Sequence, residues 1–171
     1  MRFREIILIE AQQQSVRVYH GSPYRDISEF RFDNLRHRTG TPGTLSFTTS
    51  EETARIYCSH VYEVEVQGTF GDYRDPDDVE KAFAWRWPKH EDWLKGRVPD
   101  DYDWDRSAAK LRKEIASGFY AQWENVALWR SLGWDGAWFF ESDSRNLVVG
   151  RNATIRLVGK VTGPLKALAS N

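Results

Sequence analysis

Apolar and polar residues alternate in short runs near both ends of the chain. The run 61–66 is the clearest: it predicts a half-buried strand with its valines on one face and its glutamates on the other. Similar apolar runs, bounded by glycine, proline or polar turn residues, predict further strands. These strands are expected at 16–20, 44–48, 136–141, 146–150 and 154–161.

Helical spacing replaces this alternation in the middle of the chain. It predicts a helix over 106–131, which can break near Ser117 and which ends at Gly133. The acidic run 99–105 is placed to cap that helix, since negative charge stabilises a helix N-terminus. The residues that recur at this spacing are Leu111, Ile115, Phe119, Trp123, Val126 and Trp129.

Two shorter helices are expected as well. Ser50 and the glutamates after it suit the start of a helix over 51–58. A second helix is expected at 77–87, where Pro88 would end it. Turns or loops are expected at 21–23, 24–44, 71–78 and 142–145.

The order of these elements predicts the fold class. Strands dominate both ends and helices the middle, which is typical of an α+β protein rather than of alternating βα units. Length and the absence of an internal repeat predict a single domain over 1–171. In this domain 1–15 is an N-terminal extension and 68–131 is a helical, tryptophan-rich insertion.

Composition narrows the possible functions. A net charge of −1 gives no global basic field for nucleic acid or anionic lipid. The single cysteine, Cys58, excludes an internal disulfide and fits a cytoplasmic setting. No apolar run approaches the ~20 residues of a membrane span, and the run 6–9 is too short for a signal peptide. The four histidines have no metal-ligand spacing, so no metal site is expected.

Eight tryptophans fall between Trp85 and Trp138. Aromatic side chains bury large areas, so a core rich in indoles is the favoured interpretation. A stacking platform for nucleobases is the alternative.

The segment Tyr19-His20-Gly21-Ser22, at the end of a predicted strand, carries candidate binding chemistry. His20 can hold a ribose hydroxyl, Gly21 lets a flat ligand approach the backbone, and Ser22 adds a hydroxyl. A packed structural histidine is the alternative. Tyr57, on the short helix, is expected either to wall a pocket or to pack on the sheet.

These residues resemble the motifs of the ADP-ribosyltransferase superfamily. Tyr19-His20-Gly21-Ser22 is similar to the first motif of the histidine-type branch, which includes diphtheria toxin and the poly-ADP-ribose polymerases. The run 45–58 is similar to the second motif, because Ser46 and Tyr57 have its eleven-residue spacing. The segment 133–138 resembles a Gly-aromatic-Asp-Gly turn of phage and mobile-element ADP-ribosyltransferases.

The resemblance implies a fold of split antiparallel or mixed sheets with flanking helices, and it implies NAD as co-substrate. In it, the Gly21 backbone and Ser22 would hold the nicotinamide amide, and Tyr57 would stack on the nicotinamide with Phe47 behind it. His20 would bind the adenine-side ribose. The nicotinamide–ribose bond would break through an oxocarbenium-like state, which a nearby carboxylate stabilises.

Two positions depart from this pattern. Ser46 stands where the histidine-type enzymes have tyrosine, although the arginine-type branch has serine there. The run 146–149 stands at the family's third motif, and Asn146 takes the place of the glutamate that heads its apolar strand. An asparagine can hold a ribose hydroxyl, but it supplies no charge and no base. Glu141 or Asp143 would have to take over that role, or the chain is an inactivated enzyme, or it binds its ligand without transfer.

Two functions follow from this resemblance. The first is an NAD-dependent mono-ADP-ribosyltransferase that modifies a protein or nucleic acid, as a toxin or phage effector in the cytoplasm. In this case His20, Ser46, Asn146 and Glu141 are the catalytic candidates. The second is a catalytically silent module that binds NAD, ADP-ribose or a partner peptide.

Overall fold

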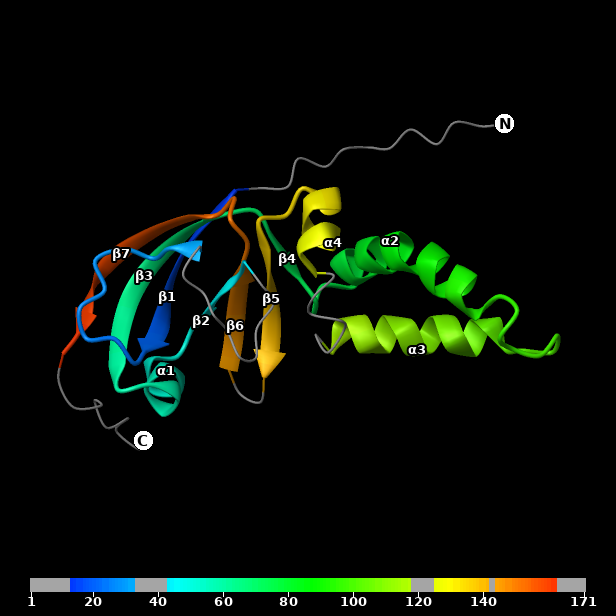
Figure 1. The fold of residues 1–171 in the computed structure, drawn as a ribbon, viewed down its shortest axis with the longest axis horizontal. Helices are drawn as coiled ribbons and strands as arrows, with labels where there is room; N and C mark the ends of the chain where they lie inside the picture. The colour runs from blue at the N-terminus through cyan, green and yellow to red at the C-terminus, as the bar shows by residue number, and fades with distance from the viewer. Residues whose placement is uncertain (1–12, 33–42, 118–124, 142–143, 163–171) are drawn as a thin grey trace.

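The computed structural model describes residues 13–32, 43–117, 125–141 and 144–162. In these ranges the chain forms a seven-stranded sheet and four helices (Figure 1). The strands are β1 (Gln14–Ser22), β2 (Leu45–Thr48), β3 (His60–Gly68), β4 (Phe70–Asp72), β5 (Gly136–Glu141), β6 (Ser144–Val149) and β7 (Thr154–Val161). The helices are α1 (Glu51–Tyr57), α2 (Pro76–Leu94), α3 (Trp104–Ala116) and α4 (Asn125–Leu132).

The strands follow the order β4-β5-β6-β2-β1-β3-β7 across the sheet. Only β4 and β5 run parallel, and the other neighbours are antiparallel. This mixed sheet with helices between its strands confirms the predicted α+β class.

The join between β1 and β2 is much shorter than the others near it. β1 pairs with β3 along its whole length, from Gln14 to Ser22. Its pairing with β2 is limited to Tyr19 opposite Thr48. Two well-paired parts of the sheet therefore meet at a single residue pair.

The two faces of the sheet have different cover. One face, called here the apolar face, carries a core cluster that includes Val18, Phe47, Val64 and Leu147, and side chains of the segment 23–32 pack against it. The opposite face, called here the helix face, carries Ala137, Phe139 and Val148, which pack with residues of α2, α3 and α4. Alternation along each strand separates these two clusters.

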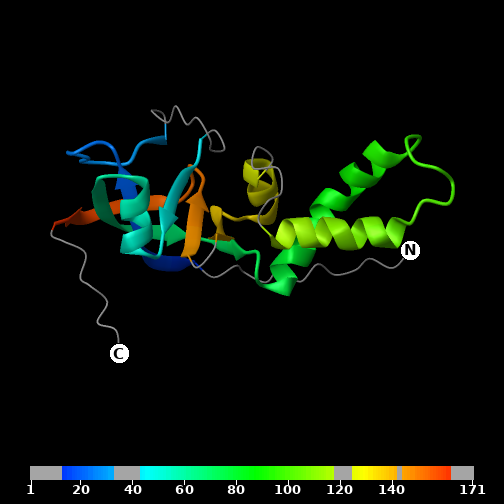
Figure 2. The same cartoon turned by 90° about the horizontal axis from the view of Figure 1, so that it is seen from below.

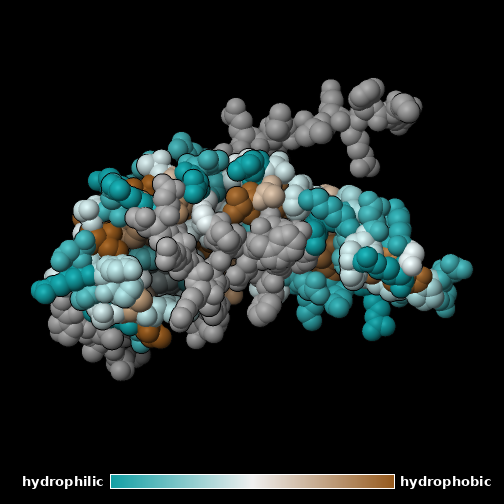
Figure 3. All heavy atoms as spheres, viewed as in Figure 1, coloured by the Kyte–Doolittle hydropathy of each residue, from teal (hydrophilic) through white to brown (hydrophobic). Residues whose placement is uncertain are grey.

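The helices α2 and α3 form a hairpin that extends away from the sheet (Figures 1 and 2). Near its tip, His90 Nε2 lies 3.3 Å from Ser107 Oγ, and Tyr102 donates its hydroxyl to the same oxygen at 3.1 Å. Hydrophilic residues cover most of this hairpin in the view of Figure 3. The hairpin lies within the segment 68–131 that the sequence marked as a helical insertion.

Local capping follows the sequence closely. Ser50 caps α1, and its hydroxyl accepts the Thr53 N–H at 3.1 Å. Asp103, in the acidic run, caps α3 by accepting the Arg106 N–H at 2.8 Å. Gly133 follows α4 with a φ of 70°, a conformation that favours glycine.

Several predicted boundaries are wrong. Pro88 does not end α2, which continues to Leu94. The segment 71–78, expected as a loop, contains the end of β4 and the start of α2. The expected helix 106–131 is described as α3 and α4, and here the predicted break is confirmed, because α3 ends at Ala116 with Ser117 as its C-cap. Gly21 and Ser22 belong to β1 and not to a turn.

One side-chain prediction for β3 is also corrected. Val64 and Val66 lie in the core of the apolar face, as expected, opposite Glu63 and Glu65. Val61 is buried as well, but alternation places it on the glutamates' face. It is registered with Gly21, on which α1 packs, and this helix accounts for its burial.

Burial of the tryptophans agrees with a structural role for three of them. Trp129, Trp134 and Trp138 are 2%, 5% and 3% exposed. Trp93, on α2, is 60% exposed and has the Arg97 guanidinium 4.8 Å from its ring centroid. Across the described ranges, no helix combines the length and apolar character needed to cross a membrane.

Candidate functional site

The segments that carry the family-like motifs lie on neighbouring elements. β1, β2 and β6 are adjacent in the sheet. Tyr19, Thr48 and Asn146 form one row across these three strands. The first and third motifs, more than a hundred residues apart in the sequence, therefore meet around the short β1–β2 join.

His20 connects β1 to β2 at this join. Its Nδ1 lies 3.0 Å from the backbone oxygen of Ser46. A carbonyl oxygen only accepts, so Nδ1 carries the proton, and in the neutral ring Nε2 is then an acceptor. The ring centroid lies 5.0 Å from that of Phe30 and 5.7 Å from that of Phe47. Packing and the hydrogen bond together fix the orientation of the imidazole.

Phe47 supports His20 from within the core. Its side chain is 2% exposed and belongs to the cluster of the apolar face. It is therefore placed as packing behind His20, and it presents almost no ring surface to a ligand.

Gly21 and Ser22 have structural partners. A Cβ at Gly21 would lie 2.3 Å from the backbone oxygen of Ala54 and 3.3 Å from Cβ of Cys58. Glycine at this position thus lets α1 approach β1. Ser22 is 2% exposed, and its hydroxyl accepts the Tyr24 N–H at 3.1 Å.

Tyr57 stands on the outer side of α1. It is 61% exposed, and its neighbour Ile56 is 76% exposed. The side of α1 that meets the sheet carries the buried Ala54. A stacking role for Tyr57 would therefore use a ring that is already at the surface beside the end of β1.

The alternation of side chains along each strand shows on which face of the sheet Ser46 and Asn146 lie. Leu147 and Phe47 lie on the apolar face, so their strand neighbours Asn146 and Ser46 lie on the helix face. Because α1 packs on Gly21, the motif helix covers that same face. The structure brings Ser46, Asn146 and α1 to one face and places the His20 ring on the other, beside Phe47.

The start of α1 is tied to β6 next to Asn146. The backbone N–H of Thr49 donates to the backbone oxygen of Arg145 at 2.9 Å, and the Thr49 hydroxyl lies 3.2 Å from the same oxygen. This link connects the second and third motifs directly through the backbone, and sequence patterns contain no signal for it.

A charged aromatic cluster beside Asn146 was also missed by the sequence analysis. Arg145 donates from Nη2 to Asp72 Oδ2 at 2.6 Å, and its guanidinium lies 4.1 Å from the Trp138 ring centroid. Within the described ranges, Arg145 Nε and Trp138 Nε1 are buried without a hydrogen-bond partner. Asp72 belongs to β4, which was expected to be a loop, so this contact could not be inferred from spacing.

Glu141 is described only through its backbone. It ends β5 opposite Ser144 of β6. Its side chain and the whole of Asp143 lie outside the described residues, so a carboxylate that replaces the missing glutamate stays a prediction.

The polar part of the helix face, on β1, β3 and β7, is covered by ion pairs. Arg17 lies 3.2 Å from Glu63, and Arg156 donates from Nε to Glu65 at 2.9 Å. Hydrogen bonds from Arg156 and then Ser15 lower the pKa of Glu65 to about 2. These carboxylates are engaged by neighbouring groups on the sheet.

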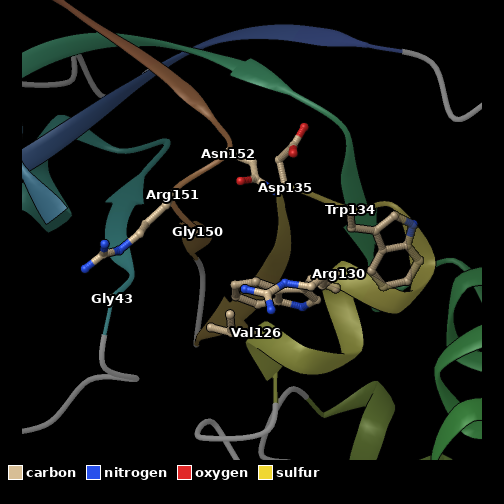
Figure 4. Close-up of a pocket in the computed structure, with 9 residues that line it drawn as sticks. Gly43, Val126, Arg130, Trp134, Asp135, Gly150, Arg151 and Asn152 are labelled. Atoms are coloured by element: carbon tan, nitrogen blue, oxygen red, sulfur yellow. The ribbon is translucent and has the colours of Figure 1, made fainter.

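A cavity of about 300 Å³ lies beside α4, and it is lined in part by Trp134 and Asp135 of the family-like turn 133–138 (Figure 4). Its walls come from α4, from the turn before β5, from the turn after β6 and from Gly43, close to the start of β2. None of the eight residues predicted to bind or catalyse is among its lining residues. The cavity and the residues predicted to bind NAD or catalyse therefore lie at two different places on the molecule.

Comparison with known proteins adds little to this picture. No family model matches the chain, and no curated protein matches it. A crystal structure of an anti-CRISPR protein aligns with 86% of this chain and 96% of its own, at 17% identity and a TM-score of 0.44. That TM-score is too low to support an argument about fold or function.

Proposed function

We propose that this chain is an NAD-dependent mono-ADP-ribosyltransferase, with its site where β1, β2, β6 and α1 meet. One observation carries the proposal: the three motif strands are neighbours, with Tyr19, Thr48 and Asn146 in one row. An ADP-ribosyltransferase-like fold belongs to the same proposal. The role of a toxin or phage effector in the cytoplasm also belongs to it, with a protein or nucleic-acid acceptor.

In this proposal the chain's own residues orient the dinucleotide. His20, held by the Ser46 carbonyl, presents Nε2 as an acceptor for a ribose hydroxyl. Tyr57 offers an exposed ring for stacking on a planar heterocycle. Asn146 can hydrogen-bond a sugar hydroxyl with its amide. These side chains lie around the β1–β2 join, with the His20 ring on the apolar face and Asn146 on the helix face, so the dinucleotide would have to reach both faces there.

The presence of asparagine at position 146, where the family has glutamate, favours a second function. Its amide is uncharged and therefore cannot stabilise an oxocarbenium-like state or remove a proton from the acceptor. A silent module that binds NAD, ADP-ribose or a partner peptide through the same residues is the alternative. The two functions differ in one measurable property, which is cleavage of the nicotinamide–ribose bond.

The test compares nicotinamide release from labelled NAD by the chain and by Asn146→Glu. For a transferase, the chain itself releases nicotinamide, and the added carboxylate raises the rate by about 10²–10⁴. Gln14→Glu, at an exposed glutamine on the end of β1 away from His20, is the matched control for the charge change and should leave the rate unchanged.

The other outcomes separate the alternatives. Release by Asn146→Glu alone indicates the silent module. Release by the unchanged chain that Glu141→Gln abolishes assigns the charge to Glu141. If calorimetry detects no NAD binding to the chain or to Asn146→Glu, the site is not where we place it. The same conclusion follows if NAD binds and Tyr57→Ala leaves its affinity unchanged.

A further inference from the structure

The cavity next to α4 has the chemistry of an anion site. Arg130 and Arg151 both line it, one from the last turn of α4 and one from the turn after β6. Both residues are exposed to solvent. Figure 4 shows the Arg130 side chain extending beside Val126 toward the turn that carries Gly150. Two guanidinium groups from separate elements therefore border one hollow.

The one acidic residue of the cavity wall, Asp135, does not pair with Arg130. Asp135 accepts the Thr69 N–H at its Oδ2, at 2.8 Å. Figure 4 shows its carboxylate pointing away from Arg130. Among the described residues, Arg130 makes no ion pair or side-chain hydrogen bond. No described neighbour thus balances the positive charge of Arg130.

The turn after β6 adds neutral donors. It is closed by the Ala153 N–H, which donates to the backbone oxygen of Gly150 at 3.2 Å. Asn152, in the middle of this turn, lines the cavity and is exposed. Here the turn and the two arginines border the same volume.

The volume of the cavity indicates a ligand larger than a single phosphate ion. A volume of about 300 Å³ is several times that of one phosphate group and is at the lower end for small-molecule sites. Val126 adds apolar surface to the wall beside Arg130, and behind it Trp129 and Trp134 are 2% and 5% exposed. A ligand with a phosphate at one end and an apolar ring at the other matches both parts.

We propose that this cavity binds the phosphate end of a nucleotide-sized phosphate ester. The guanidinium of Arg130 is the main contact, with Arg151 and the turn at Asn152 as further donors. This site is separate from the one proposed for NAD. Leu45 and Val149 pair at the cavity end of β2 and β6, whereas Thr48 and Asn146 pair at the other end, about 10 Å along the strands.

Titration calorimetry of the full chain with adenosine 5′-monophosphate, inorganic phosphate and adenosine tests this proposal. The monophosphate should bind, and adenosine should not. Arg130→Gln should weaken binding about 10- to 100-fold, the usual effect of losing a hydrogen bond to a charged group. Arg106→Gln, an exposed arginine on α3, is the matched control and should bind as the unchanged chain does.

Comparison of the ligands identifies the source of the phosphate, and comparison of the variants identifies the place of binding. Equal binding of inorganic phosphate and the monophosphate means that the site takes free phosphate. Binding that Tyr57→Ala abolishes and Arg130→Gln does not would place the nucleotide at the motif strands and overturn the proposal. No binding of either phosphate compound below about 1 mM would also overturn it. Thermal melting checks that Arg130→Gln is folded.

Discussion

Individual motif residues in this chain also support the fold. Gly21 is expected, from the family resemblance, to admit a ligand to the backbone. In the structure it admits α1, because the Ala54 carbonyl occupies the place of a side chain. Ser22 and Phe47 are likewise buried in contacts within the chain. Resemblance in a motif can thus reflect packing needs as well as binding chemistry.

Gly21→Ala should destabilise the chain. The added methyl group would meet the Ala54 backbone oxygen at 2.3 Å, so α1 must shift. We expect a loss of about 1–3 kcal/mol in the free energy of unfolding, as for other overpacked positions. Gly159→Ala on β7 is the control, since nothing lies within 4 Å of a Cβ there. Equal urea midpoints for the two variants would contradict the contact with α1.

The helix starts were predictable because they depend on neighbours in sequence. Ser50 and Asp103 each accept an N–H three residues later, which is a local requirement of helix N-termini. The continuation of α2 through Pro88 was not predictable in this way. Phe83 is buried in the cluster of the helix face, Trp87 meets Trp104 of α3 with ring centroids 6.3 Å apart, and Leu94 is buried, so tertiary contacts stabilise both halves of α2.

The α2–α3 hairpin should weaken in acid. Burial, followed by the charge of Arg86, lowers the pKa of His90, so the folded hairpin favours the neutral ring. Its contribution to stability is present above the unfolded pKa near 6.5 and is lost as the pH falls through the folded pKa. Urea unfolding should therefore show a decrease from about pH 7.5 to about pH 5. His90→Gln keeps a hydrogen-bonding group without titrating and should reduce this decrease. An unchanged pH dependence in that variant would contradict the role of His90.

Two cores on opposite faces of one sheet hold the molecule together. The cluster on the helix face includes Trp129, whose Nε1 donates to the Tyr73 hydroxyl at 3.2 Å. Burial raises the pKa of Tyr73 to about 12. The strands β5 and β6 contribute side chains to both clusters. A substitution that disrupts one cluster should therefore also destabilise the other.

Trp129→Ala should therefore destabilise the whole chain. Truncation of a buried tryptophan typically costs about 3–5 kcal/mol, and Trp129 is 2% exposed. Trp93→Ala is the matched control, because Trp93 is 60% exposed and should cost less than about 0.5 kcal/mol. Circular dichroism during urea unfolding measures both variants. A large loss for Trp93→Ala would contradict the burial pattern and indicate a packed role for the hairpin surface.

The sequence alone determines most of the strands, all but β4, and the places where several helices begin. Alternating valines and the serine and aspartate caps act over a few residues, so their effect does not depend on the rest of the fold. Tertiary structure decided the rest. β4 exists because it pairs in parallel with β5, more than sixty residues away. The separation of His20 and Asn146 onto different faces follows from strand registers, which depend on how distant segments compete to bury their apolar sides.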